Sequence, residues 1–328
     1  MLTRAAARAR LVSLLLFAAF AGCRGDGGTR VLKLAHGLDV NHPVHLAMVH
    51  MADRVAELSA GAMRVEVHPN GQLGDERELI EMLQIGSLAM TKVSASPLES
   101  FVPEMAVFGM PYLFRDDEHL WEVLDGPIGR RLLLAGQRYY LRGLCYYDAG
   151  ARSFYTRDTP IRKPEDLKGL KIRVQKSLTA TRMVQALGGA ATPIDWGELY
   201  SALQQGVVDG AENNPPSFYL SRHYEASRFY SLDEHTRVPD VLLISTRVWE
   251  DLSRQERDWL TAAVGSSVVE QRRLWREASD YAMTQVRAAG VEVIEPDKRL
   301  FREAVRPMHE SYRGTPLFDL IREIEETR

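Results

Sequence analysis

Three side chains between Gly169 and Pro216 have the chemistry to bind a carboxylate: Arg173, Trp196 and Asn213. The guanidinium of Arg173 can grip a carboxylate through two parallel hydrogen bonds and stays charged at any relevant pH. The amide of Asn213 can donate to the same group, and Trp196 can flank it. These residue types therefore predict a pocket for a carboxylate.

The segment that carries these residues reads as strand, helix, strand, helix and strand. Lys171–Val174 predicts a strand, and Ser177 can cap the helix that follows. Asp195 and Glu198 predict a capping box that opens a helix from 198 to 205, and Val207–Asp209 predicts another strand, closed by Gly210. Ligands bind outside the carboxyl ends of the strands in open α/β sheets. Arg173 and Asn213 are expected at such ends.

The rest of the chain repeats strand and helix units. Strands are predicted at 31–35 and 63–67, and helices at 44–58 and 75–85. Ser253 and Glu256 form a second capping box, at the start of a periodic run that reaches Ala289. At 1.5 Å per residue such a helix is about 50 Å long, which is longer than one small domain. The pattern predicts an α/β fold with a largely parallel sheet and a long helix that spans two domains.

Several motifs resemble the solute-binding proteins of TRAP (tripartite ATP-independent periplasmic) transporters, the DctP-like family. They are the runs 166–174, 192–204 and 208–215, together with Gly71–Gly74 and Phe108–Phe114 upstream. The resemblance covers nearly all of the chain after its first 30 residues. It implies a two-domain periplasmic binding protein whose α/β domains are joined by crossing strands and close on a ligand in the cleft between them. It also implies domain I from 31–151 plus 241–278, and domain II from 152–240 plus 279–328.

The resemblance also assigns roles to residues. Arg173 matches the arginine that pairs with the substrate carboxylate, Arg152 a second ligand-facing arginine, Asn213 an amide that touches the carboxylate, and Trp196 an aromatic that flanks the ligand. Further candidates for the ligand site are Lys92, His36, Asp75, Glu76, Gln175 and Asn214. Structural alternatives remain at this stage. Arg173 could pair with a carboxylate of the sheet, Asp75 and Glu76 could only stabilise a helix N-terminus, and Asn213 and Asn214 could only form a turn.

The first 30 residues predict export. Residues 1–10 carry three arginines and no acid, 11–21 are apolar, and small residues precede Cys23. This is the pattern of a signal peptide, assigned to 1–22, and it resembles a bacterial lipobox with Cys23 as the lipidated residue. Residues 23–30 then form a flexible tether, and the protein is periplasmic. The alternative is ordinary cleavage nearby without a lipid.

Other classes of function find little support. With 41 basic and 44 acidic residues the net charge is −3, which implies no nucleic acid partner and no membrane contact beyond a lipid anchor. His36, His42, His45 and His50 lie close in sequence, but their spacing does not favour a metal site. No catalytic motif stands out, so we expect neither catalytic residues nor a cofactor. Cys145, in an apolar strand, is expected to be buried and unreactive.

These observations predict an extracytoplasmic receptor that binds an anionic organic acid and delivers it to the membrane subunits of a TRAP permease. The polar candidates opposite Arg173 favour a sugar acid, namely a hexuronate such as glucuronate or galacturonate. The alternatives are a receptor for a C4-dicarboxylate such as malate or succinate, for which Lys92 or Arg152 would meet a second carboxylate, and the ligand-binding input of a membrane sensor.

Overall fold

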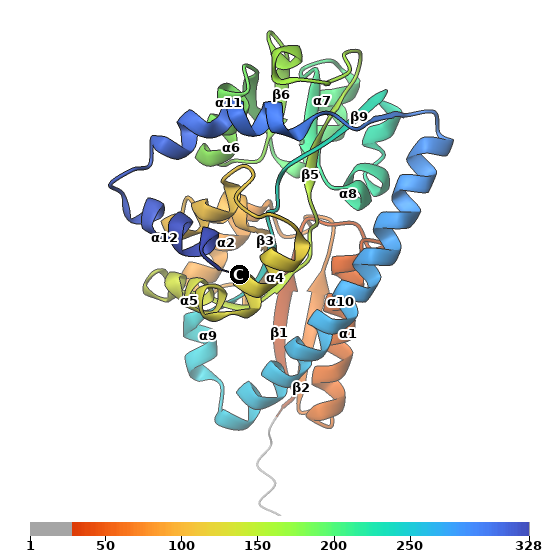
Figure 1. The fold of residues 1–328 in the computed structure, drawn as a ribbon. Coiled ribbons are helices and arrows are strands. Elements are labelled where there is room, and N and C mark those ends of the chain that lie inside the picture. Colours follow the sequence, from red (N-terminus) through yellow and green to blue (C-terminus); the bar gives the residue numbers. More distant parts are fainter. Residues whose placement is uncertain (1–27, 328) are drawn as a thin grey trace, which may run out of the picture.

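The computed structural model describes residues 28–327 and contains two β-sheets, one above the other in Figure 1, with helices packed around both. The signal peptide and Cys23 lie outside the described residues. The chain passes from the first sheet to the second between Tyr147 and Arg152, and it returns between Thr236 and Asp240. Within 28–327 no helix is both long and apolar enough to cross a bilayer.

The first sheet has five strands in the order β2-β1-β3-β10-β4. Their bounds are β1 Arg30–Ala35, β2 Met63–His68, β3 Met90–Ser94, β4 Leu141–Tyr147 and β10 Asp240–Ser245. Around it lie α1 Pro43–Leu58, α2 Glu76–Ile85, α3 Ala95–Leu98, η1 Pro103–Gly109, α4 Asp117–Asp125, α5 Pro127–Ala135, η2 Gly136–Tyr139 and α9 Thr246–Asp251.

The second sheet has six strands in the order β11-β9-β5-β8-β6-β7. Their bounds are β5 Arg152–Thr156, β6 Lys171–Val174, β7 Ala190–Pro193, β8 Gly210–Asn213, β9 Phe229–Thr236 and β11 Glu292–Ile294. The connecting helices are η3 Pro164–Leu167, α6 Leu178–Ala186, η4 Trp196–Glu198, α7 Leu199–Gln204, α8 Pro215–Leu220, η5 His223–Glu225, α11 Lys298–Glu310 and α12 Pro316–Glu325.

Both sheets are mixed rather than largely parallel. β1 runs parallel to β2 and β3, and β6 runs parallel to β7 and β8. By contrast, β10 is antiparallel to β3 and β4, and β5 is antiparallel to β8 and β9. β5 and β10 are the strands through which the chain enters a sheet after crossing from the other. An antiparallel strand at each crossing therefore replaces the uniform βαβ pattern that the sequence suggested.

The long predicted helix is present as α10, Arg254–Ala288, and it packs against α1 near the first sheet and against α8 near the second (Figure 1). Its capping box is formed as expected, because the Ser253 hydroxyl accepts a hydrogen bond from the Glu256 amide and the Glu256 carboxylate accepts one from the Ser253 amide. Gly290 follows the helix in the left-handed conformation, with φ of 89°. This helix braces both halves of the molecule.

α10 also holds the first crossing in place. The Gln271 side chain accepts a hydrogen bond from the Asp148 amide and donates one to the Asp148 carbonyl, both at 2.8 Å. Gly150, with φ of 57°, lies so close to Trp275 that an added Cβ would be 3.2 Å from the indole ring. The crossing therefore needs glycine here both for its backbone conformation and for its contact with the helix.

Two local predictions were wrong. Asp195 makes no capping hydrogen bond, because its carboxylate pairs with Lys176, and a short η4 precedes α7. Val207–Asp209 is not a strand; the strand is β8, which begins at Gly210 and pairs with β5 and β6 on its two sides. Asp209 instead accepts a hydrogen bond from the Lys171 amide at 2.8 Å and so aligns β8 with β6.

The last helix lies away from the domain to which its sequence position assigned it. α11 packs on α6 and β9 of the second half, as expected for residues 279–328, whereas α12 packs against η1 of the first half. Arg131 of α5 also pairs with Glu323 of α12. The chain therefore returns to the first half before it ends.

Candidate functional site

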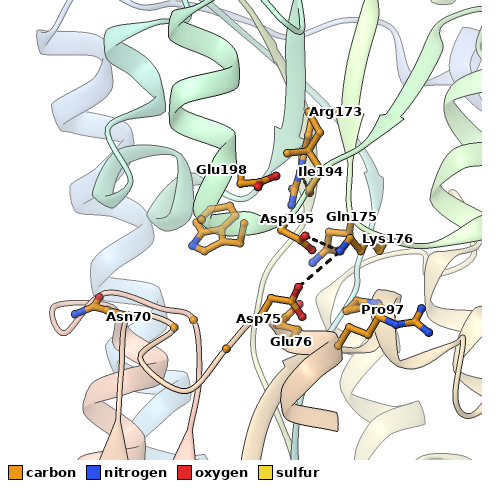
Figure 2. A pocket seen from close by; sticks show the side chains of 16 residues that line it. Asn70, Asp75, Glu76, Pro97, Arg173, Gln175, Lys176, Ile194, Asp195 and Glu198 are labelled. Carbon is orange, nitrogen blue, oxygen red and sulfur yellow. Dashed lines mark hydrogen bonds and ion pairs between the residues drawn. The ribbon is translucent and has the colours of Figure 1, made fainter. Parts of the chain in front are cut away.

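A cleft of about 330 Å³ lies between the two halves and is lined by side chains from both. The first half contributes Gly37, Asn70, Gly71, Gly74, the start of α2 and Pro97, and the second half contributes Arg173 of β6, Gln175, Lys176 and 194–198. A smaller cavity of about 50 Å³ shares Gly37, Glu76, Gln175 and Trp196 with the cleft. We treat the two as one site, shown in part in Figure 2.

Arg173 enters this site from β6. Its side chain is nearly inaccessible, with a 2% exposed residue surface, and its Nε donates to the Ile194 carbonyl at 2.8 Å. Its Nη1 has no hydrogen-bond partner among residues 28–327. The guanidinium carbon lies 5.9 Å from the centre of the Trp196 ring, within the range of a cation–π contact. Burial lowers the pKa of Arg173, so the site holds its charge at a cost that a bound anion would offset.

Arg152, the second expected arginine, already has a carboxylate. It lies at the start of β5 and forms a buried ion pair with Glu212 of β8, including an Nη2–Oε1 hydrogen bond of 2.9 Å. Its Nη1 donates to the Asn213 side-chain oxygen at 3.0 Å. Arg152 lines the smaller cavity. Its charge is therefore balanced within the protein.

Lys92 on β3 is neutralised in the same way. Its ammonium lies 3.2 Å from Asp240 and 3.5 Å from Glu76, and all three residues line the smaller cavity. Burial alone would lower the pKa of Lys92, but the two acids raise it, so the lysine stays charged. Burial raises the pKa of Glu76 in turn, against the opposing effect of Lys92.

Lys176 closes the wall of the larger cleft. Figure 2 shows its ammonium between two carboxylates, 2.5 Å from Asp195 of its own half and 3.6 Å from Asp75 of the other half. Arg77, the remaining basic residue of the lining, pairs with Glu81 at 3.1 Å. Among the basic side chains that line the site in the described part of the chain, Arg173 alone has no ion-pair partner.

A buried network stands behind the Arg152–Glu212 pair. His235 lies 3.5 Å from Glu212 through Nε2 and 2.9 Å from Asp233 through Nδ1. Burial alone would lower the pKa of His235, but Asp233 and Glu212 raise it to about 9. Burial alone would raise the pKa of Glu212, but Arg152 and His235 lower it to about 2. Both groups are therefore charged at neutral pH, and they keep Arg152 fixed.

The amide candidates lie where β8 passes into α8. Asn213 accepts from Arg152 and from the Asn214 amide, and Asn214 caps α8 by accepting from the Ser217 amide at 2.9 Å. Both line the smaller cavity. Gln175 and Trp196 line both cavities, and the Ser94 hydroxyl donates to Gln175 at 3.3 Å across the cleft.

The acidic candidates Asp75 and Glu76 also reach the site. Asp75 caps α2 in a reciprocal capping box with Glu78, so the expected role at a helix start is present, and its carboxylate still borders the cleft. Glu76 lines both cavities.

His36 does not reach the site. Its ring is fully buried, lies 3.0 Å from the His45 ring nitrogen, and accepts from the Leu38 amide. It lines neither cavity. Burial lowers the pKa of His36 to about 2, so it is neutral. Within residues 28–327, no group of three or more His, Cys, Asp or Glu could hold a metal ion.

Sequence reasoning missed the acids that neutralise the cations. Glu212, Asp240 and Asp195 each pair with a basic residue of the site. An acid so close to Asn213, inside the strand that ends there, could have indicated that Glu212 is paired. The sequence does not show that its partner is Arg152, because β5 and β8 become neighbours only in the folded sheet.

Comparison with known proteins identifies the class. A model of the family "Bacterial extracellular solute-binding protein, family 7" matches residues 34–315. The structure is similar to a TRAP periplasmic solute-binding protein of Bradyrhizobium sp. BTAi1 in complex with α/β-D-galacturonate, with 42% identity, a TM-score of 0.88, and 91% of this chain and 100% of that one covered.

Two further relatives are similar over most of their length. A TRAP periplasmic solute-binding protein of Pseudomonas putida F1 with bound D-glucuronate is 35% identical with a TM-score of 0.87, over 91% of this chain and 97% of that one. The C4-dicarboxylate-binding periplasmic protein DctP of Rhodobacter capsulatus is 28% identical over 85% of both chains. The chain belongs to this family of solute-binding proteins, those of TRAP transporters.

Proposed function

We propose that this protein binds one molecule of a hexuronate, D-galacturonate or D-glucuronate, and delivers it to a TRAP membrane permease. One observation carries the substrate class: Arg173 is the cation of the site that lacks a counterion among residues 28–327, whereas Arg77, Lys92, Arg152 and Lys176 each have one. A ligand with a single carboxylate fits this charge arrangement.

The rest of the site suits hydroxyl groups. Asp75, Asp195 and Glu198 line the larger cleft with carboxylates, and Gln175 adds an amide. The carboxylates can accept hydrogen bonds from the hydroxyl groups of a polyhydroxylated ring, and the amide can accept or donate them. Hydrogen bonds to a charged partner are stronger than those between neutral groups. The volume of the cleft, about 330 Å³, is in the usual range for small-molecule sites. The relatives with bound galacturonate and glucuronate support this choice.

A C4-dicarboxylate is the second candidate, and the DctP relative favours it. Its second carboxylate would need Lys92, Arg152 or Lys176 to leave an acid already in contact. It would also meet the carboxylates of Asp75, Asp195 and Glu198. Like charges in a partly desolvated cleft repel, so the geometry favours the monoanion.

Calorimetric titration with D-galacturonate, D-glucuronate, gluconate, malate and succinate tests the proposal. We expect tight binding of one or both hexuronates and at least about a hundredfold weaker binding of succinate. The second carboxylate of succinate would find no free cation among the described residues and would meet the acids of the cleft, and together these two effects are worth several kcal/mol. Tight binding of succinate together with no heat from any sugar acid would overturn it. Recovery of the ligand chemically unchanged from the complex is expected of a receptor that performs no catalysis.

We further propose that the protein works in the periplasm, anchored through a lipid on Cys23 after removal of residues 1–22, with the residues from Cys23 up to the start of β1 at Arg30 as its tether. The sequence before Cys23 supports this anchor. Mass spectrometry of the mature N-terminus tests it: a diacylglyceryl cysteine is expected, and an unmodified N-terminus at another residue would contradict it. The division into two closing domains, 31–151 plus 241–278 and 152–240 plus 279–328 with α12 packed on the first, is proposed with it. If no permease subunits co-purify but a membrane kinase does, the alternative role as a sensor input takes precedence.

A further inference from the structure

The two halves of the molecule also touch outside the cleft, where α3 and η1 of the first half meet the start of α6 of the second. Glu99 directly follows α3, and its Oε1 accepts a hydrogen bond from the Thr179 amide at 3.0 Å. The residue is buried, and its Oε2 has no hydrogen-bond partner among residues 28–327. Neither Glu99 nor Thr179 lines the cleft or the smaller cavity.

Gly109, the last residue of η1, packs against the same threonine. A Cβ added to Gly109 would lie 2.9 Å from Thr179 Cγ2 and 3.0 Å from Thr179 Cβ, closer than carbon atoms pack. Its φ is not in the left-handed region, so the backbone alone does not demand glycine here. The absence of a side chain at Gly109 is what lets the two halves approach to their present distance.

Thr179 belongs to the same segment as the ligand arginine. β6 carries Arg173 and leads directly into α6, and the residues between them, Gln175 and Lys176, contact Ser94 and Asp75 of the first half. A movement of α6 away from η1 would therefore carry the end of β6, with Arg173, away from the cleft wall formed by α2. The contact at Thr179 and the geometry of the ligand site are mechanically connected.

We propose that Glu99, Gly109 and Thr179 form a closure contact, which sets ligand affinity from outside the ligand site. The proposal rests on the proposed function, because it assumes that ligand binds to the closed form. The contact joins elements that belong to different sheets, so a movement of one half relative to the other would alter it. The observed affinity of a receptor is its intrinsic affinity multiplied by the fraction of molecules in the competent state. Anything that weakens the closure contact therefore weakens binding without touching the ligand.

A steric wedge at this contact gives the direct test. The probe is whichever of D-galacturonate, D-glucuronate, malate or succinate binds the wild-type protein most tightly, so a dicarboxylate result overturns the proposed substrate and leaves this test intact. Gly109→Ala should weaken binding by about fivefold to a hundredfold, since overpacking a close contact commonly costs 1–3 kcal/mol. The loss should come mainly from faster dissociation, measured by stopped-flow fluorescence.

A double variant separates the contact from a general effect on the fold. Thr179→Gly removes both Cγ2 and Cβ, the two atoms that the new methyl group would strike, so Gly109→Ala combined with Thr179→Gly should recover most of the lost affinity, to within about threefold of Thr179→Gly alone. As a matched control, Gly265→Ala adds the same methyl group within α10, where no atom lies within 4 Å, and should leave the dissociation constant unchanged.

Glu99→Gln tests the same contact without added volume. It keeps the shape of the side chain but removes the negative charge at the N-terminal turn of α6, and it should weaken binding by about two- to fivefold. Dissociation constants of Gly109→Ala and Glu99→Gln within about 1.5-fold of the wild type, with both variants folded, would overturn the proposal. A loss in Gly109→Ala that persists undiminished in the double variant would overturn it as well.

Discussion

Arg152 and Glu212 form a buried ion pair on neighbouring strands of the second sheet, which gives the arginine a permanent counterion within the protein. Arg173, on the next strand beyond β8, has no such partner among the described residues. Two arginines that look alike in the sequence therefore have different roles. Arg152 is bonded to Glu212 and to Asn213 within the sheet, and we propose that Arg173 binds the ligand carboxylate.

The first prediction follows from this difference. Arg173→Ala should weaken binding by tens to thousands of fold while the protein remains folded, because loss of one partner of a desolvated charged pair costs about 2–5 kcal/mol. Arg173→Lys should also bind poorly, since an ammonium cannot replace the two parallel donors. Calorimetry measures both variants, and an affinity close to wild type in either would refute the assignment.

Replacing Arg173 should raise the thermal stability of the ligand-free protein even though it weakens ligand binding. Arg173→Met replaces a buried guanidinium that has no ion-pair partner among residues 28–327 by an apolar side chain, so the ligand-free variant should melt at a higher temperature than the ligand-free wild type. Differential scanning calorimetry without ligand provides the measurement. A lower melting temperature would mean that Arg173 has a stabilising partner in solution, and the site would then need another cation for the ligand.

Glu212→Gln should be strongly destabilising. The substitution leaves Arg152 buried without its counterion, and breaking a buried pair from one side typically costs roughly 3–5 kcal/mol. Urea unfolding of Glu212→Gln beside the matched variant Glu323→Gln, which breaks the exposed pair with Arg131, gives the contrast. The exposed pair should matter by less than about 1 kcal/mol. Equal effects of the two variants would be incompatible with the buried network.

The same network predicts how stability depends on pH. The pKa of Glu212 is about 2 in the folded protein against 4.5 ordinarily, so its contribution is present above pH 4.5 and is lost as the pH falls through 2. The pKa of His235 is about 9 against 6.5, so its contribution is present below pH 6.5 and is lost as the pH rises through 9. Urea unfolding between pH 2 and 10 should show both limbs. His235→Gln should remove the alkaline one, and an unchanged alkaline limb in that variant would assign it to another group.

Substitutions in the cleft wall should change its preference between a monocarboxylate and a dicarboxylate. Lys176 is held by Asp195 and Asp75, so replacing both acids by Asn frees a cation on the cleft wall. Binding of malate relative to D-galacturonate should then improve by about two- to fivefold, since partly exposed pairs are worth 0.2–1 kcal/mol. Competition titrations give this ratio. A ratio that stays at the wild-type value would show that Lys176 does not take part in discrimination.

Ligand should make the protein more compact. A sugar acid whose carboxylate is held by Arg173 and whose hydroxyl groups contact the opposite wall bridges both halves. Binding therefore shifts the population toward the closed form. Solution scattering should give a smaller radius of gyration with ligand. The melting temperature should rise by mass action, with about 2.7 kcal/mol of added stability at a ligand concentration a hundred times the dissociation constant. Tight binding with no change in radius would contradict closure.

Much of this arrangement could be read from the sequence, since its signals are local. Ser177 caps a helix as expected, Asp75 lies at the start of a helix as expected, and Arg173 lies in a short strand that ends at the cleft. The errors occurred where long-range contacts override local preference. Residues 210–213 contain Gly, Ala, Glu and Asn, which are poor strand formers, yet pairing with β5 and β6 on both sides makes them a strand.

The charge states within the site could not be predicted for the same reason. Lys92 was a candidate for a second ligand carboxylate, but Asp240, which neutralises it, comes from a strand inserted after a distant crossing. The sequence predicts Asp195 as a helix cap, but in the structure its carboxylate pairs with Lys176 instead. Sequence alone finds the ionisable groups of a site, whereas the three-dimensional pairing decides which of them remains available.

The long helix α10 has a consequence for how the receptor meets its membrane partner. Two extended crossings alone would let the halves swing and twist freely. A stiff rod that packs against both α1 and α8, and grips the first crossing through Gln271, acts as a third linkage and restrains the twist. We therefore expect the relative motion of the two halves to stay close to rotation about one axis. With the proposed closure, we expect such a receptor to present two outer shapes, one empty and one loaded, which a permease could distinguish by fit alone.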